Sequence, residues 1–340
     1  MRLSVLDQSV AIAGRPQSVS IRESIELAQF CEGLGYHRFW VAEHHNHDTI
    51  TGTAPEVLMA AIAATTKRIR IGSAGVMLPH YSSLKVAEQF RVLDAIAPDR
   101  IDLGLGRAPG SDGRTAFALN PNAGQAAAQF PEQVRDLLAW VSGEPLPAGH
   151  PYGMIRAFPS SDTSPDMWML GTSDYGAQVA AHFGIPYCFA HFITQGQGCA
   201  QALALYRQHY QPSERHPEPI ATVCVWALVT DTVEEANHQY MPRARSRLAR
   251  DRGVLQAIES PEFAAAQPYT AAEQARIDAL REDAFVGTPD KVGEQLRNLA
   301  QQLGVDELVV LTWTHDLAVR KHSYELLAKE FSIASNAEEE

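Results

Sequence analysis

Short apolar runs in this chain end repeatedly in polar residues, and helical segments separate the runs. The clearest example is Phe39–Ala42, which leads directly into Glu43, His44 and His45. Other runs end in the same way, at His80, Arg107, Thr172–Ser173, His191 and His315. Parallel α/β barrels place their active sites where buried strands end. The recurrence of such ends therefore indicates an enzyme built on a parallel sheet.

Eight apolar runs of strand length alternate with segments of helical spacing. The expected strands are 3–6, 39–42, 69–77, 101–105, 168–170, 187–190, 221–229 and 307–312. The expected helices are 20–34, 55–66, 84–97, 132–141, 175–183, 199–210, 289–303 and 322–331. This order predicts an α/β fold of the (β/α)8 TIM-barrel type. A doubly wound sheet is the alternative, but the expected Gly-x-Gly-x-x-Gly loop does not follow the first strand.

Two segments interrupt the alternation, after the fourth and seventh strands. Residues 108–165 are rich in Gly, Pro, Asn, Ser and Asp, and we expect them to form a mobile lid or entrance. Residues 233–285 read as a helical insertion with several arginines, at Arg243, Arg245, Arg247, Arg250 and Arg252. The expected organisation is one barrel domain over 1–335, followed by an acidic tail over 336–340.

The charge, the cysteines and the apolar runs of the chain indicate its possible partners and its compartment. The formal net charge of −12 disfavours nucleic acid and anionic membranes as partners. The four cysteines have no Cys-x-x-Cys spacing, so we expect buried thiols in a reducing compartment. The start of the chain lacks the apolar core of a signal peptide, and no apolar run approaches membrane-spanning length. These features predict a cytoplasmic protein.

The adjacent histidines His44 and His45 are the leading candidates for proton transfer. Strand geometry would point their rings to opposite faces, so that one faces the barrel mouth and the other packs behind it or at an interface. An imidazole at the mouth suits proton transfer near neutral pH. Structural roles and metal ligation are alternatives. A metal pair on a strand prefers His-x-His, which occurs here only at His45 and His47 in an expected loop.

Two neighbouring strand ends carry groups that suit a phosphate. Arg107 follows Gly104 and Gly106, and a guanidinium can bind phosphate through two parallel hydrogen bonds. The run 170–174, Leu-Gly-Thr-Ser-Asp, opens a helix whose free N–H groups attract anions. Asp174 as the helix's own cap is an alternative interpretation of that run.

The third strand has small residues through its middle, including Gly72, Ala74 and Gly75. Glycine within a strand often marks a bulge or the close approach of a ligand. A flat ring lying on Ala74 and Gly75 beside Met77 is one explanation. Tight packing inside the barrel is the other.

Together these segments resemble the bacterial-luciferase-like flavin-dependent monooxygenases over essentially the whole chain. The matching segments are 39–45 (FWVAEHH), 69–79 (IRIGSAGVMLP), 86–90 (VAEQF), 104–107 (GLGR), 286–289 (VGTP) and 306–308 (DEL). The similarity is strongest in the first 110 residues. Within the family, the chain looks most like the single-chain luciferase-like oxidoreductases.

The resemblance implies reduced FMN, usually supplied by a separate flavin reductase, and dioxygen that oxygenates an organic substrate. The family's catalytic histidine corresponds to His44 and its phosphate-binding arginine to Arg107. The flavin would also contact positions on three strand ends, at Ala74, Gly75, Gly106, Gly171, Thr172 and Ser173. Relatives often carry a non-proline cis peptide at Ala74–Gly75. Gly106 replaces the reactive cysteine of luciferase, which argues against luminescence and leaves monooxygenation intact.

The resemblance further implies a homodimer formed through the helices expected at 55–66 and 84–97. The small side chains of the first helix allow close packing, at Ala60, Ala61, Ala63 and Ala64. A deazaflavin-dependent oxidoreductase, a metal-dependent barrel hydrolase and a catalytically silent flavin-binding protein are the alternative functions. His80, His191 and His315 are alternative candidates for the catalytic histidine. The sequence does not identify the organic substrate.

Overall fold

Eight parallel strands form a closed barrel in the computed structural model, which describes residues 1–282 and 284–333. The barrel strands are β1 (Arg2–Asp7), β2 (Arg38–Val41), β3 (Arg70–Ser73), β5 (Ile101–Gly106), β6 (Asp166–Gly171), β7 (Tyr187–Phe189), β8 (Ala221–Val229) and β10 (Glu307–Leu311). Each strand pairs with the next, and β10 pairs with both β8 and β1, which closes the barrel. The predicted TIM barrel is confirmed. The acidic tail expected at 336–340 lies outside the described residues.

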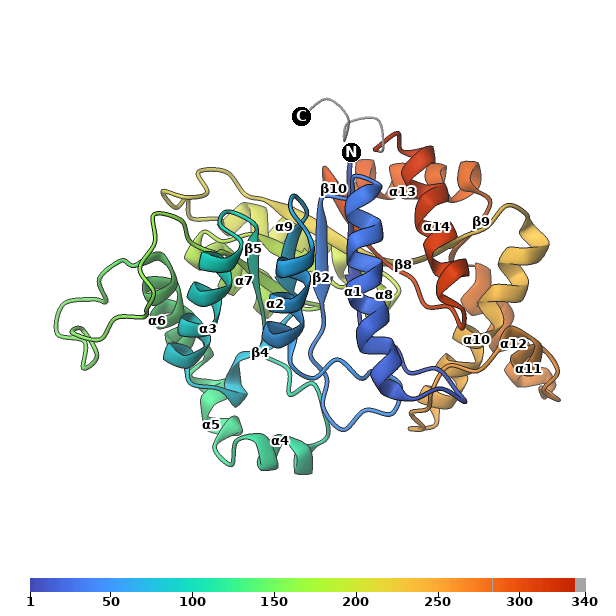
Figure 1. Cartoon of the computed structure of the whole chain (residues 1–340), viewed down its shortest axis with the longest axis horizontal. Coiled ribbons are helices and arrows are strands. Elements are labelled where there is room, and N and C mark those ends of the chain that lie inside the picture. Colours follow the sequence, from blue (N-terminus) through green and yellow to red (C-terminus); the bar gives the residue numbers. More distant parts are fainter. Residues whose placement is uncertain (283, 334–340) are drawn as a thin grey trace.

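Helices surround the barrel between successive strands (Figure 1). They are α1 (Gln17–Gly33), α2 (Pro55–Thr65), α3 (Ser83–Ile96), α6 (Phe130–Ser142), α7 (Asp174–Phe183), α9 (Cys199–His209), α13 (Pro289–Leu303) and α14 (Leu317–Glu330). The N-terminus lies at the top of Figure 1, whereas α4 (Gly113–Leu119), α5 (Ala123–Ala128) and α11 (Pro261–Ala265) lie near the bottom. Because the strands run away from the N-terminal end, these helices lie on the side of the mouth formed by the carboxyl ends.

The third expected strand is interrupted. β3 ends at Ser73, the Ala74–Gly75 peptide is cis, and β4 (Val76–Met77) continues by pairing with β5. The cis peptide expected from the family resemblance is therefore confirmed. The last helix begins at Leu317, five residues before the predicted start, because the Asp316 side chain caps it by accepting the Ala318 N–H at 2.7 Å.

The insertions after the fourth and seventh barrel strands each contain several elements of secondary structure. Residues 233–285 form α10 (Val233–Asp251), α11 and α12 (Ala271–Glu282), and β9 (Phe285–Gly287) pairs with the end of β8. Within 108–165, α4 and α5 contain no buried residue. By contrast, α6 packs on α3 and buries Phe130, Val134 and Leu137 completely. Because α6 is anchored in the core whereas α4 and α5 are not, a lid proposal applies only to about 108–129.

The end of the barrel opposite the mouth is closed by a buried ionic network. Arg38 donates to Asp102 at 2.8 Å and to Glu307 at 2.9 Å, and all three side chains are almost completely buried. The Arg38 guanidinium also lies 4.7 Å from the centre of the Trp168 ring. Arg70 makes a second ion pair with Asp102 at 2.6 Å. These contacts connect four strands by charge at the base of the barrel.

Candidate active site

His44 lies in the loop that follows β2 at the barrel mouth. Its backbone N–H donates to the Gly52 carbonyl at 2.8 Å, and its half-buried ring meets the His47 ring edge-on at 5.5 Å. The buried Nδ1 atom has no hydrogen-bond partner among the described residues. Burial, with further contributions from His47 and Arg250, lowers the pKa of His44 to about 4. The ring is therefore neutral at pH 7.

The loop carrying His44 is tied to the segment after α10. The Thr49 hydroxyl donates to the Gln256 carbonyl at 2.7 Å, and Gln256 N–H donates back to Thr49 Oγ1 at 3.1 Å. This connection explains why Arg250, far away in the sequence, lies near enough to influence His44. The insertion after β8 therefore forms one wall of the mouth.

His45 contacts a different part of the structure from His44. Its Nε2 lies 2.7 Å from Oε1 of Glu43, a carboxylate that is only 1% exposed. The same carboxylate accepts the Met77 N–H at 3.0 Å and the Tyr81 hydroxyl at 2.6 Å. The rings of His44 and His45 thus have different neighbours. Both residues lie beyond the end of β2 at Val41, so the alternation of side chains along a strand does not cause this difference. Glu43 positions the loop, and the contacts of His45 are structural.

Arg107 extends from the end of β5 with its side chain exposed. Its guanidinium lies 4.1 Å from the centre of the Tyr175 ring, and no hydrogen bond or ion pair to another described residue holds it. Stacking on Tyr175, in the first turn of α7, brings the cation to the start of that helix. Sequence reasoning missed Tyr175, since an aromatic residue in a helix usually serves the core.

The start of α7 has N–H groups available for an anion. Ser173 is the N-cap residue, and its side chain makes no capping hydrogen bond. Asp174 is not the cap, because it is the first helical residue and accepts from Gln201 at 2.7 Å. Gly171 and Thr172 precede this turn and are half-buried. With Arg107 alongside, the turn has the donor set that a phosphate requires.

The glycines from β3 to β5 are required mainly because neighbouring strand backbones pack closely there. A Cβ on Gly75 would lie 2.7 Å from the Gly104 carbonyl oxygen, and a Cβ on Gly104 would lie 2.0 Å from the Ser73 oxygen. A Cβ on Gly106 would lie 3.1 Å from the Met77 sulfur. The close approach that these glycines allow is therefore to neighbouring strands. Ala74 is half-buried and packs against the apolar cluster inside the barrel.

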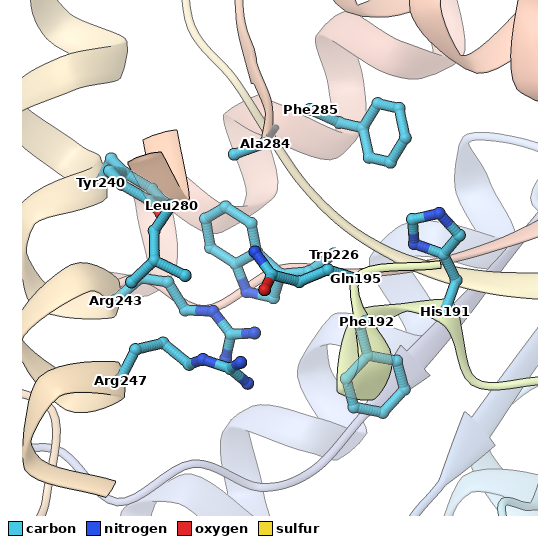
Figure 2. Close-up of a pocket in the computed structure, with 10 residues that line it drawn as sticks. All are labelled: His191, Phe192, Gln195, Trp226, Tyr240, Arg243, Arg247, Leu280, Ala284 and Phe285. Carbon is cyan, nitrogen blue, oxygen red and sulfur yellow. The ribbon is translucent and has the colours of Figure 1, made fainter. Parts of the chain in front are cut away.

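The three alternative histidines lie in separate environments. His80 is buried, with Nε2 at 2.7 Å from the Pro109 carbonyl oxygen, so its role is structural. His315 lines a small cavity with Glu23 and Arg320, next to α1 and α14. His191 lines a larger cavity at the ends of β7 and β8, where burial lowers its pKa (Figure 2).

No group of three or more His, Cys, Asp or Glu side chains is arranged to hold a metal ion among residues 1–282 and 284–333. Within the same ranges, no helix is both long and apolar enough to span a membrane. All four cysteines are buried and free.

A closed parallel barrel that gathers a desolvated imidazole and an unpaired arginine at its mouth has the form of an α/β-barrel enzyme. The family described as luciferase-like monooxygenase matches residues 1–307. The chain belongs to this family, and it is an oxidoreductase of the monooxygenase kind. The resemblance inferred from the sequence motifs is confirmed.

Related proteins cover the chain almost completely. The uncharacterised protein YwcH of Bacillus subtilis (strain 168) is 41% identical over 97% of this chain and 99% of its own length. The N-acetyl-S-alkylcysteine monooxygenase of the same organism is 36% identical over 96% of this chain and 97% of its own length. The crystal structure of apo-MsnO8 superposes with a TM-score of 0.89, at 36% identity and 98% coverage of both chains.

Proposed function

We propose that this protein is a flavin-dependent monooxygenase that uses reduced FMN and dioxygen to oxygenate a small organic substrate. The observation that carries the proposal is the Arg107 guanidinium, which is unpaired among the described residues and stacked on Tyr175 at the uncapped start of α7. A phosphate there would receive the guanidinium and the helix N–H groups together. Thr172 and Ser173 would add hydroxyl donors.

The flavin ring would lie over Ala74 and Gly75, at the break between β3 and β4, with Gly106 and Gly171 beside it. When bound, reduced FMN supplies the electrons that activate dioxygen, and a separate flavin reductase is the proposed source of the reduced form. His44 would accept or return a proton in the oxygen chemistry, because its ring is neutral at physiological pH. The exposed segment around α4 and α5 would shield the site from water.

The relatives support a small organic substrate. N-acetyl-S-alkylcysteine monooxygenase is named for a small sulfur compound, and it matches this chain over nearly its full length. A deazaflavin would need similar contacts for its ring and phosphate, so cofactor choice requires a direct test. Reduced FMN and reduced deazaflavin should each be titrated against the pure protein, followed by oxygen uptake with aldehydes, aromatic compounds, thiols and sulfonates. Tight binding of the deazaflavin alone, without oxygen uptake on reduced FMN, would refute the proposal.

Replacing Arg107 with alanine is expected to weaken FMN binding by about ten- to a hundredfold. The estimate corresponds to the loss of hydrogen bonds to a charged group, about 1.5–3 kcal/mol. Flavin titration of both proteins measures the change. Riboflavin, which lacks the phosphate, is the matched ligand and should bind the variant and the parent protein equally well. Unchanged FMN affinity would show that the phosphate binds elsewhere.

We further propose a homodimer formed through α2 and α3. Large apolar side chains are exposed on both helices, with Val57 66%, Val92 49% and Ile96 48% exposed. Ala63 does not belong to this face, since it is only 5% exposed and packs in the core. Light scattering at micromolar concentration should give twice the chain mass. Replacing Val57 with Lys should produce monomers, and a parent protein that is already monomeric would contradict the proposal.

A further inference from the structure

A cavity at the barrel mouth, separate from the Arg107 region, contains two arginines and no carboxylate (Figure 2). It lies between the segment that follows β7, strand β8 and helix α10, and its internal free volume is about 60 Å³. Its lining residues are His191, Phe192, Gln195, Trp226, Tyr240, Arg243, Arg247, Leu280, Ala284 and Phe285.

Arg243 is buried in this cavity without a counter-charge. It is only 8% exposed, and its guanidinium lies 5.0 Å from the Trp226 ring centre and 4.6 Å from that of Trp313. No hydrogen bond or ion pair reaches it from residues 1–282 or 284–333. Burial, followed by repulsion from Arg247, lowers the pKa of Arg243 to about 9. Arg38, which is equally buried, makes ion pairs with two carboxylates.

A second donor in the same cavity also lacks an acceptor. The Nε1 atom of Trp226 is buried, and no described residue accepts its hydrogen. Figure 2 shows the Arg243 and Arg247 guanidinium groups beside each other next to this indole, and the Gln195 amide overlaps the indole in this view. Buried donors are normally satisfied, so a cluster of unsatisfied donors indicates a ligand that brings acceptors.

The sequence of α10 gives independent support. Arg243, Arg247 and Arg250 are spaced by four and three residues, which puts their positions on one helix face. Like charges at such spacing repel, so the helix by itself gains nothing from this arrangement. Arg250 lies near enough to His44 to lower its pKa. The arginine face therefore extends from the cavity toward the candidate catalytic histidine.

We propose that Arg243, assisted by Arg247, binds the anionic group of the organic substrate, and that this substrate is a small carboxylic acid. The apolar part of the acid would contact Phe192 and Phe285, with the Trp226 indole donating to the carboxylate. That the bound acid is a substrate rests on the proposed monooxygenase function. Binding of an anion by Arg243 and Arg247 does not depend on that function. It differs from the Arg107 site, which lies at the ends of β5 and β6.

The test compares two matched probes, phenylacetate and phenylacetamide, by titration calorimetry on the full-length protein. The parent protein should bind the acid at least tenfold more tightly than the amide. Arg243→Gln should remove that preference, with a ten- to hundredfold loss for the acid and little change for the amide. Arg247→Gln, at a half-buried position, should reduce the preference by a smaller factor. Arg252→Gln removes the same charge from the exposed end of the segment, where Arg252 pairs with Glu273, and should keep the preference.

Four outcomes would overturn the proposal. The parent protein could bind both probes equally, it could bind neither below 10 mM, or Arg243→Gln could retain the preference while folded. The fourth is that Arg243→Gln weakens FMN binding but not riboflavin binding, which would assign the cavity to the flavin phosphate. Failure of the flavin proposal gives a different pattern, since Arg107→Ala would then leave FMN binding unchanged while the acid preference remained.

Discussion

Replacing His44 with alanine is expected to lower substrate oxygenation by about 10²- to 10⁴-fold, the usual contribution of a positioned proton-transfer group. Affinity for reduced flavin should change by well under tenfold, because the phosphate contacts come from Arg107 and the start of α7. Oxygen uptake coupled to product formation measures the first effect, and anaerobic flavin titration measures the second. Full coupled turnover in the variant would transfer the role to His191 or to His315.

His45→Ala is the matched control for this experiment. Its ring bonds to the Glu43 carboxylate, which also accepts from Met77 and Tyr81. Loss of the ring should therefore lower thermal stability and loosen the loop rather than remove a proton carrier. Equal losses of turnover in the two variants, without a stability difference, would show that the two imidazoles do not have distinct roles.

The acid dependence of the reaction follows from the lowered pKa of His44. A proton acceptor must be unprotonated, and burial holds the His44 pKa at about 4 instead of 6.5. Activity that depends on His44 should therefore persist as pH falls through 6.5 and decline only near pH 4. The free energy of unfolding begins to fall at a higher pH than the activity does. Below about pH 6.5 the unfolded chain takes up a proton at His44, whereas the folded site resists protonation. Acid inactivation between these values should consequently be accompanied by unfolding.

The sequence predicted the barrel well because apolar runs of strand length alternate with segments of helical spacing, and polar residues mark the ends of most of these runs. Candidate residues at strand ends, such as His44 and Arg107, could be found for the same reason. The Ala74–Gly75 break was accessible through family resemblance alone, since no local pattern in residues 69–77 ends the strand. The strand glycines could not be interpreted from the sequence alone. Glycine is required both where a ligand approaches the backbone closely and where a neighbouring strand does, and the structure shows the second at Gly75 and Gly104.

Residues that act through long-range contacts were missed. Tyr175 orients Arg107 from the next strand-helix unit, and Trp226 of β8 packs against Arg243 of α10. The spacing of Arg243, Arg247 and Arg250 was visible in the sequence as a cationic helix face. Without the fold, such a face is more simply interpreted as solvated surface. Burial of Arg243 without a carboxylate partner is what distinguishes the two interpretations.

Replacing Arg38 with methionine is expected to destabilise the fold by about 3–5 kcal/mol, because a buried ion pair that loses one partner leaves an uncompensated charge. Burial opposes ionisation at this site, but Asp102 and Glu307 outweigh it and raise the pKa of Arg38. For Asp102, Arg38 and Arg70 likewise outweigh burial and lower the carboxyl pKa. Urea unfolding at pH 7, followed by tryptophan fluorescence, measures the loss.

The double variant Arg38→Met with Glu307→Gln tests the cause of that loss. Glu307 accepts from Ser4 at 2.6 Å as well as from Arg38, while Asp102 keeps Arg70 as a partner. Removing the charge of Glu307 should therefore recover part of the stability lost in the single variant.

The contribution of Asp102 to stability is present above its unfolded pKa of about 3.9 and is lost as pH falls through its lower folded value. A single variant within 1 kcal/mol of the parent would mean that the network is not a net source of stability. FMN affinity should be unchanged in the folded variants, since the network lies at the base of the barrel and the flavin contacts lie at its mouth.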